Sequence, residues 1–491
     1  MTLIEMFPLE VMKSNDYLSL LPLFLLSFGA IVALLLGTHK TKGHERAFYA
    51  SATILTLCLL NLGMNVSGEA TVLLKGTIII DSFTRTLAFF ATTFAIIAAI
   101  ITRGTDVKEH LLSEVYALIL FSTAGMILMM STNHLLFMFI ALEIMSLAVY
   151  VMVAMRRTSY FSAEAGLKYF ILGGLGSALL LYGSSLIFGA TGTFDLYTIQ
   201  SVISSKAPTA IFYVGLGLVL TAMLFKVGAV PFHGWVPDVY QGAATNVTAF
   251  MSAGVKFTAF MALARICQHT VFIEGVAALR WFESYIWIVA AASMIYGNFV
   301  AISQNEVKRM LSFSTIAHTG YLLLGLYAMK MGPEAAQSVI LYLFFYALSS
   351  LGAFAIVAQF ESTNDKDLRI EQMAGLGLRH PVMGACMTIF LLSMAGIPLT
   401  SGFIGKYGLF NAAVGAGEVP LVVIAVLTSV VSVYYYLRVI VFMYMKEADG
   451  SQAIYQNLKG AGLAATISAA ATVQFGLFPR AIIQIVKYLG K

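Results

Sequence analysis

Charged side chains are scarce in this sequence, where they make up 11% of the 491 residues. A soluble domain usually carries about a quarter charged residues. Hydrophobic residues make up 59% of the chain, and the mean hydropathy is +0.86. No soluble fold of this length could bury so much apolar surface, so most of it must face lipid or neighbouring helices. The sequence therefore predicts an integral membrane protein.

Cysteine is also rare, and its three occurrences, Cys58, Cys267 and Cys386, each stand alone in an apolar stretch. None has the paired spacing of a disulfide framework, a zinc site or an iron–sulfur site. We therefore expect packing roles for all three, and no metal or cofactor in this chain. The net charge of +5 comes from scattered basic residues, with no stripe that could follow phosphates, which excludes nucleic acid as a partner.

Long apolar runs fill most of the chain. A helix that crosses the hydrocarbon core needs about 20 apolar residues. The runs lack the period-two alternation of barrel strands, so we expect no strands and an all-α membrane domain spanning 1–491. About fourteen transmembrane helices are predicted, at 17–37, 47–66, 78–102, 111–130, 133–155, 161–190, 208–230, 243–265, 281–302, 310–329, 336–360, 382–412, 419–445 and 459–479.

The loop charges predict an orientation. Lysine and arginine favour one set of alternate loops by fourteen to nine, beginning with the first loop, 38–46. Cytoplasmic loops carry the excess of these residues, so we place the first loop in the cytoplasm and both termini on the other side. The first 16 residues carry three acidic residues against one lysine. They lack the positive region of a cleaved signal peptide, so the first run is expected to remain as a helix.

Two of the runs are interrupted by glycine and proline, at Gly228–Pro231 and at Gly396–Pro398. Proline removes a backbone donor and clashes with the preceding turn, so each helix should break there. Lys226 precedes the first break and Lys406 follows the second. Paired broken helices indicate an inverted-repeat transporter. The alternative is that both prolines only kink their helices; the matching positions and nearby charges favour function.

A few ionisable residues lie inside the runs. A charge at mid-bilayer costs at least about 2.5–3.5 kcal/mol, so it rarely persists without a partner or a use. Glu143 and Lys256 lie near the middle of their runs, while Lys226 and Lys406 adjoin the breaks. A purely structural ion pair could be replaced by apolar packing at little cost, which favours a functional role for these four. Lysine suits proton transfer because burial and a nearby carboxylate shift its proton affinity in opposite directions.

Three further positions keep two explanations open. Lys168 lies four residues after Glu164, so a local salt bridge explains it almost as well as a proton relay. His318 is either a hydrogen-bonded packing residue or a relay. His233 is expected at the membrane edge, where it would close a helix end or accept protons from the cytoplasm.

Other charges near the ends of runs are expected to be structural. Asp81 and Arg85 are four residues apart at the start of a helix, which favours a local ion pair. Arg438 follows an aromatic run, Tyr434–Tyr436, and is expected to extend to the surface or bind a lipid headgroup.

One segment resembles a known signature. Residues 226–243, from Lys226 through Pro-Phe-His-Gly-Trp-Val-Pro-Asp-Val-Tyr-Gln-Gly-Ala, resemble the antiporter-like membrane subunits of respiratory complex I, the proton-translocating NADH–quinone oxidoreductase. The likeness extends over nearly the whole chain. The ending at Asp238–Gly242 and a lysine at position 406 are most similar to the subunit N branch. One departure is Ala244–Asn246, where the family usually has proline; we expect a loop change there. Supporting stretches are 142–143, 308–311, 314–321 and 396–406.

The resemblance implies a fourteen-helix fold with two inverted five-helix repeats, about 111–265 and 281–445. It also implies that Glu143 pairs with Lys226, that Lys256 is the central relay and that Lys406 leads outward. Lys168 matches a further basic position of the family.

The resemblance further implies the surroundings of the chain. Its partners would be other membrane-arm subunits, including antiporter-like ones, together with lipids, in a bacterial inner membrane with both termini periplasmic. NADH, FMN, iron–sulfur clusters and quinone would bind partner subunits, so this chain would be a non-redox, proton-translocating subunit. Two alternatives remain: a subunit of an Mrp-type sodium–proton antiporter, or a structural membrane subunit.

Overall fold

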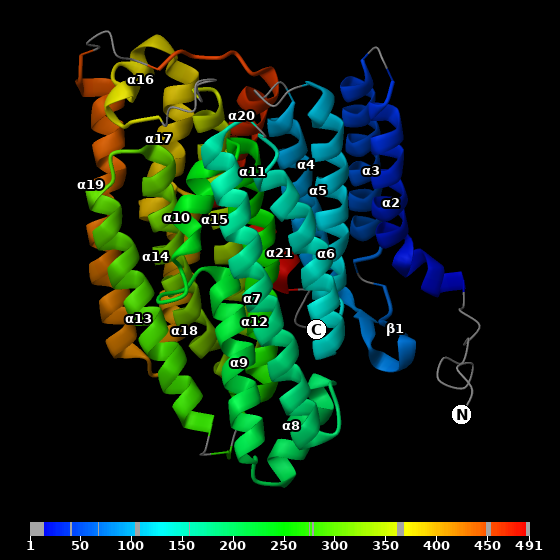
Figure 1. Ribbon diagram of the computed structural model, residues 1–491. Helices are drawn as coiled ribbons and strands as arrows, with labels where there is room; N and C mark the ends of the chain where they lie inside the picture. The colour runs from blue at the N-terminus through cyan, green and yellow to red at the C-terminus, as the bar shows by residue number, and fades with distance from the viewer. Residues whose placement is uncertain are drawn as a thin grey trace.

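Long helices stand side by side in a single bundle (Figure 1). The computed structural model describes residues 14–39, 42–66, 68–103, 109–156, 158–273, 275–276, 279–360, 368–447 and 453–487. Within those ranges, twelve helical segments are long and apolar enough to cross a membrane. The all-α membrane fold expected from composition is therefore confirmed.

The segments that meet this criterion are α2 (Ser14–Gly37), α3 (Gly43–Met64), α4 (Ser82–Thr102), α5 (Glu109–Met130), α6 (Leu135–Val153), α7 (Tyr160–Thr191), α9 (Ala210–Val227), the joined α11 (Thr245–Phe250) and α12 (Lys256–Thr270), α13 (Arg280–Ser303), α15 (Pro333–Ala358), α19 (Val419–Met445) and α20 (Lys459–Leu477).

The two remaining predicted runs correspond to less apolar or shorter helices. The run at 310–329 is α14 (Val307–Ala328), whose first turn carries Lys308 and Arg309. The run at 382–412 is two helices of 15 residues each, α17 (Pro381–Ala395) and α18 (Ser401–Gly415). Hydropathy and length therefore exclude both from the count of spans, although each lies where a span was predicted.

Both predicted breaks are present. Helix α9 ends at Val227, and Gly228 turns the chain with a φ of 72°; α17 ends at Ala395, and Gly396 has a φ of 86°. Residues with a side chain adopt such left-handed φ values only at a cost, so glycine is favoured at both turns. The chain resumes as the short helix α10 (Trp235–Gly242) after the first break and as α18 after the second.

The expectation of a chain without strands is wrong at one short hairpin. Strand β1 (Thr71–Leu73) pairs antiparallel with β2 (Ile78–Ile80), so the predicted run at 78–102 begins as a strand and α4 begins at Ser82. A hydropathy window averages composition, and three isoleucines before a helix lengthen the run without being helical. The 3-10 turn between the two strands is η1 (Leu74–Gly76).

Two other local expectations also change. Ala244–Asn246 is not a loop, because Ala244 is the N-cap residue of α11 and the next two residues begin that helix. Between α11 and α12, residues Met251–Val255 form a turn of π-helix, η2, which no sequence pattern had indicated. The remaining short elements are α8 (Leu196–Ser205), α16 (Leu376–Arg379), α21 (Arg480–Lys487), η4 (Met329–Met331) and η5 (Glu371–Met373).

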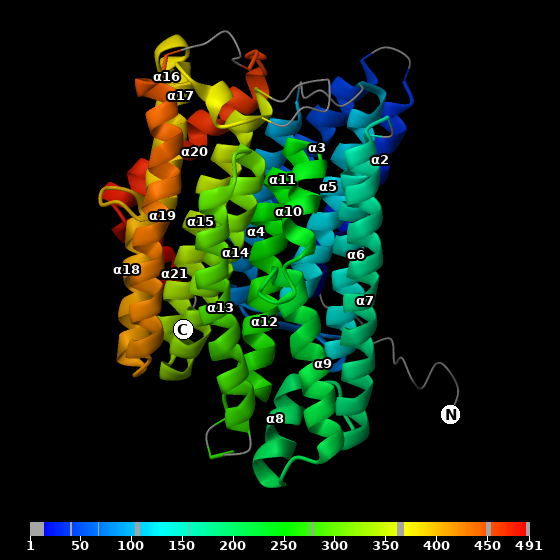
Figure 2. The same ribbon diagram turned by 60° about the vertical axis from the view of Figure 1, so that its left-hand side comes forward.

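The helices at the centre of the bundle differ from those at its edge. The apolar window of the α11–α12 span is 100% buried and that of α15 is 94% buried, against 28% and 33% for α2 and α3. Figure 2 shows α14 and α15 inside the bundle and α2 at its margin. All three cysteines are buried and free, which confirms their packing role.

Close helix crossings recur in the two halves of the chain. A Cβ on Gly125 of α5 would lie 2.5 Å from the nitrogen of Met145 in α6, and one on Gly297 of α13 would lie 2.5 Å from the nitrogen of Ala317 in α14. Small residues at such crossings let membrane helices pack backbone against backbone. Matched crossings and matched breaks fit the predicted repeats at 111–265 and 281–445, although that division stays a prediction.

Candidate functional site

Lys226 lies in the last turn of α9, immediately before the first break, and is buried. Its Nζ donates to Ser146 Oγ of α6 at 2.7 Å and lies 3.5 Å from the hydroxyl of Tyr169 in α7. The ammonium also faces the Tyr169 ring at 5.3 Å. Hydroxyl oxygens and an aromatic face therefore replace the water that a lysine would have at the surface.

Glu143 is half-buried on α6, one turn before Ser146. Its carboxylate accepts a hydrogen bond from Ser177 of α7. Among the described residues no ion pair joins Glu143 to Lys226, so the direct pair implied by the resemblance is absent from this arrangement. The two charges attract each other at longer range, with the Ser146 hydroxyl next to the lysine.

Helix α14 connects the first break to Lys256. The Thr319 hydroxyl lies 3.0 Å from the carbonyl oxygen of Val227, the last residue of α9, and 3.1 Å from that of Thr315. Lys256 Nζ donates to the same Thr315 carbonyl at 2.6 Å. The end of the broken helix and the second buried lysine therefore share a pair of threonines one turn apart on α14.

Lys256 is the first residue of α12 and follows the π-helical turn directly. Its side chain is buried, and its Nζ lies 5.0 Å from the centre of the Tyr346 ring of α15. The π-helical turn is itself tied to α15, because Ser350 donates to Ser252 at 2.8 Å. Single π-helical turns inside helices frequently mark functional sites.

His318 is buried within a ring of tyrosines. Its Nδ1 lies 2.5 Å from the Tyr342 hydroxyl, and its Nε2 lies 3.2 Å from the Tyr436 hydroxyl. The Tyr436 hydroxyl also bonds Ser314, one turn before His318. Both imidazole nitrogens thus have a hydroxyl that can donate or accept.

The imidazole lies between two lysine–tyrosine pairs. Its ring is 4.6 Å from Tyr346, which faces Lys256, and 5.6 Å from Tyr321. Tyr321 in turn faces Lys406, whose Nζ lies 5.0 Å from the ring centre. The structure therefore places His318 between Lys256 and Lys406.

Lys406 of α18 folds back over the second break. Its Nζ donates to the carbonyl oxygen of Ala395, the last residue of α17, at 3.0 Å, and to Ser429 Oγ of α19 at 2.8 Å. A Cβ on Gly396 would lie 2.8 Å from Cδ of this lysine. The lysine side chain therefore covers the turn and supplies a donor to the freed end of the helix.

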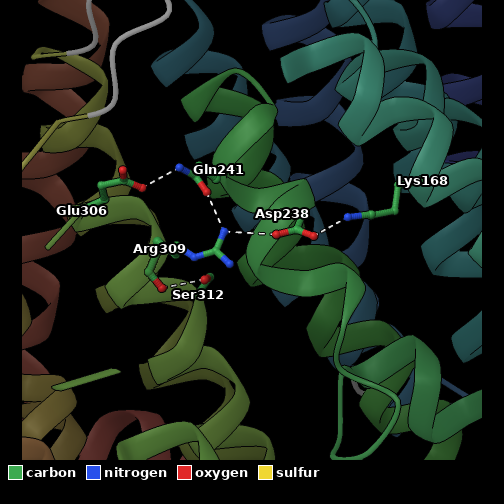
Figure 3. Close-up of polar contacts among 6 residues, drawn as sticks. All are labelled: Lys168, Asp238, Gln241, Glu306, Arg309 and Ser312. Carbon is green, nitrogen blue, oxygen red and sulfur yellow. Dashed lines mark hydrogen bonds and ion pairs between the residues drawn. The ribbon is translucent and has the colours of Figure 1, made fainter. Parts of the chain in front are cut away.

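A charged cluster fixes the short helix α10 to its neighbours (Figure 3). Asp238 forms ion pairs with Lys168 of α7 and, at 3.1 Å, with Arg309 of α14. Arg309 also donates to Gln241 Oε1 at 2.7 Å, and Gln241 donates to Glu306. The helix after the first break is thus joined to both halves of the chain.

This cluster corrects the expectation for Lys168. Its described ion pair is made with Asp238, 70 residues away, and not with Glu164 on its own helix. About a third of each side chain is exposed, 36% for Lys168 and 35% for Asp238. In the sequence Asp238 is recognisable only as part of the segment 226–243, because spacing within one helix cannot show a partner on another.

His233 lies in the first break, between the end of α9 at Val227 and the start of α10 at Trp235. Its place relative to the membrane edge stays a prediction. The His233 ring packs edge-on against Tyr296 at 4.6 Å, and its buried Nδ1 has no hydrogen-bond partner among the described residues. Among the described residues, no hydrogen bond or ring contact joins His233 to Lys226, Lys256 or Lys406.

The other charges in the spans have structural partners. Arg438 is not extended to a lipid surface: it donates to Asn305 Oδ1 at 2.8 Å and to two carbonyls near the end of α13. Arg85 binds the carbonyls of residues 68–69 at 2.6 and 2.8 Å, while Asp81 caps α4. Their structural role is confirmed, although Asp81 and Arg85 form no ion pair with each other in the described structure.

Comparison with known proteins adds a family to this geometry. The family described as NADH:quinone oxidoreductase/Mrp antiporter, TM, matches residues 132–432. NADH-quinone oxidoreductase subunit N of Trichlorobacter lovleyi is 39% identical over 422 residues, covering 84% of this chain and 85% of its own length. The protein of the same name from Myxococcus xanthus is 37% identical over 504 aligned residues, covering 94% of this chain and 95% of its own.

A solved structure has the same arrangement of helices. A chain of respiratory complex I from Thermus thermophilus is 32% identical and superposes with a TM-score of 0.80. The match covers 94% of this chain and 98% of that one. The family segment contains both breaks and all of the predicted lysines.

Proposed function

The chain belongs to the NADH:quinone oxidoreductase/Mrp antiporter membrane family, and from that premise we propose that it is a membrane-arm subunit of NADH–quinone oxidoreductase that moves protons through its buried lysines. The names of its relatives agree with the subunit N likeness of Asp238–Gly242. The observation that carries the proposal is the burial of Lys226, Lys256 and Lys406 among hydroxyl and carbonyl oxygens inside the bundle.

The redox chemistry belongs to partner subunits in this proposal. NADH, FMN, iron–sulfur clusters and quinone bind there, and this chain is a non-redox subunit in a bacterial inner membrane with its termini on the periplasmic side. Its own contribution is to load, pass and release protons. No group of His, Cys, Asp and Glu among the described residues is arranged to hold a metal ion.

Loading takes place at Lys226. Its ammonium is held by two hydroxyls and attracted by Glu143 without a direct ion pair. A signal that moves Glu143 toward Lys226 stabilises the protonated amine, and one that moves it away favours release. The hydrogen bond from Ser177 holds the Glu143 carboxylate in one position. The proposed switch is the loss of this bond and a movement of the carboxylate toward Ser146, whose hydroxyl bonds Lys226.

Transfer inward passes the end of the first broken helix. The carbonyls of Val227 and Thr315 only accept hydrogen bonds, so they cannot hand a proton to the Thr319 hydroxyl that bonds them. Thr319 therefore orients the route, because it fixes the end of α9 against the Thr315 carbonyl that holds Lys256. In this proposal water molecules carry the proton from the Lys226 ammonium to the Lys256 amine.

Transfer outward uses His318. A neutral imidazole accepts at one nitrogen and donates at the other, so it can take up a proton on one side and release one on the other. Tyr342 and Tyr436 bond its two nitrogens, while aromatic rings face the two flanking lysines. His318 thus relays between Lys256 and Lys406, and Lys406 releases the proton on the far side. Lys168 holds α10 in place for this route.

The test is proton pumping by the intact complex in sealed vesicles. We expect Lys226→Met and Glu143→Gln to lower NADH-driven proton uptake while NADH oxidation by an artificial acceptor continues. Lys206→Met, an exposed lysine after α8, is the matched control and should pump normally. Full pumping by both site variants in assembled complexes would defeat the proposal. Sodium-dependent proton exchange without NADH oxidation would instead assign the chain to an Mrp-type antiporter.

A further inference from the structure

A pocket separate from the three buried lysines opens between α3, α4 and α20. Its volume is about 320 Å³. Its walls are mainly apolar, with Ala52 on α3, Ile96 and Ile100 on α4 and Leu463 on α20. The pocket lies beside α3, one of the least buried helices, so it adjoins the surface that faces lipid.

Two cationic side chains, those of Arg103 and Lys459, line this pocket. Arg103 follows the last residue of α4, and Lys459 is the first residue of α20. The Arg103 guanidinium lies over the ring of Phe48 at 4.9 Å and donates to the Tyr49 hydroxyl at 3.2 Å. Both side chains are exposed, and among the described residues neither forms an ion pair with a carboxylate.

A glycine brings the end of α4 and the start of α20 together. A Cβ on Gly460 would lie 2.2 Å from the carbonyl oxygen of Ile100 and 2.8 Å from that of Arg103. Helix α20 therefore meets the end of α4 at a distance that only glycine permits, and Arg103 and Lys459 line the same pocket. Two cations in one pocket with no carboxylate paired to them among the described residues are suited to a bound anion.

We infer that this pocket binds one anionic phospholipid, with its phosphate between Arg103 and Lys459 and an acyl chain along α3, α4 and α20. Basic pockets between membrane helices recognise lipid headgroups in this way. The apolar walls identify the ligand as a lipid, because a free phosphate ion would gain nothing from them. The site involves none of the residues of the proposed proton route.

The experiment measures lipid retention by the intact complex. The complex is equilibrated with phosphatidylethanolamine vesicles containing increasing phosphatidylglycerol, extracted gently, and the phosphatidylglycerol bound to this chain is counted by native mass spectrometry. Each cation near the membrane surface contributes roughly 1 kcal/mol, so Arg103→Gln with Lys459→Gln should weaken retention about 30-fold. The single variant Lys459→Gln removes an exposed side chain and should weaken it about fivefold.

Two further variants separate a lipid from other anions. Lys446→Gln changes an exposed lysine after α19, on the opposite side of the bundle from α3 in Figure 1, and should leave retention unchanged. Ala52→Phe fills the apolar wall and leaves both cations, so it should also reduce retention. Equal retention by the wild type and the double charge variant would overturn the inference. Displacement of the lipid by inorganic phosphate, with Ala52→Phe unaffected, would also overturn it and indicate a free-anion site.

Discussion

The two broken helices turn the chain with the same backbone conformation, but the lysine near each break makes different hydrogen bonds. Each ends at a glycine in the left-handed region, Gly228 or Gly396. At the first break the carbonyls of the helix end are bonded by other side chains: Trp235 donates to Phe225 at 2.9 Å, and Thr319 donates to Val227.

At the second break the lysine itself bonds the helix end, because Lys406 donates to the carbonyl of Ala395. Lys226 has no such backbone bond and is held only by the side chains of α6 and α7. The comparison suggests that Lys226 can change its partners without disturbing its helix, whereas Lys406 combines charge transfer with a structural role.

We expect the largest effect on proton pumping from a variant that removes the imidazole between Lys256 and Lys406. His318→Phe keeps an aromatic ring between the lysine–tyrosine pairs and removes both nitrogens. General acid–base groups contribute about 100-fold or more, so we expect NADH-driven proton pumping to fall by at least about tenfold. The measurement is the initial rate of proton uptake in vesicles. His233→Phe is the matched control at the first break, and an equal loss there would remove the distinction between the two histidines.

The second prediction compares how much Lys226 and Lys406 each contribute to the free energy of unfolding. Lys406→Met leaves the Ala395 carbonyl without its lysine donor, and an unsatisfied buried acceptor costs about 1–3 kcal/mol. Lys226→Met leaves a hydroxyl that already bonds the Leu142 carbonyl, so its free energy of unfolding should stay close to that of the wild type. Denaturant titration in detergent compares the two variants. Equal destabilisation would show that the breaks do not differ in this way.

The third prediction tests the glycines of the two turns. Gly228→Ala and Gly396→Ala each place a side chain at positive φ, which costs about 1–2 kcal/mol. At Gly228 the new Cβ would lie 2.7 Å from Val236 Cγ2, a stiff β-branched side chain, whereas at Gly396 it meets the flexible Lys406. We therefore expect the larger drop in melting temperature for Gly228→Ala. The reverse order would mean that Lys406 cannot move aside.

The smallest effect concerns the charged cluster around α10. Asp238→Asn removes two partly exposed ion pairs, and such pairs contribute about 1 kcal/mol or less. The loss in the free energy of unfolding should shrink at high salt, because ions screen exposed charges. A matched variant, Glu283→Gln, removes the separate ion pair with Lys330, and its loss in the free energy of unfolding should show the same dependence on salt. A loss in Asp238→Asn that does not depend on salt would argue against an electrostatic origin.

Much of the fold could be predicted from local sequence. Apolar runs located nearly all the spanning helices, and Gly228–Pro231 and Gly396–Pro398 located both breaks, because hydropathy and backbone stereochemistry act within a few residues. The errors in the predicted secondary structure also arose from local sequence. Ile78–Ile80 looked like the start of a helix, and the π-helical turn before Lys256 has no composition of its own.

The candidate site was predictable only in part. Buried charges stand out in an apolar sequence, so Lys226, Lys256 and Lys406 were found without a structure. Their partners were not: Ser146, Thr319 and the tyrosines around His318 are ordinary residues for a membrane helix. The hydroxyl residues in Ser314–Tyr321 are a sequence signal for these partners, because they surround His318 in the chain.

The amino-acid sequence alone predicts that this chain is a helical membrane protein, where its helices break and that Lys226, Lys256 and Lys406 lie inside it. These properties follow from solvation and from allowed backbone angles, which depend on each residue and its neighbours. The tertiary structure alone decided that Lys226 bonds Ser146 at a separation of 80 residues and that His318 bonds Tyr436 at a separation of 118. Hydrogen bonds between helices depend on which helix faces meet, and a short stretch of sequence does not show which neighbour a given face packs against.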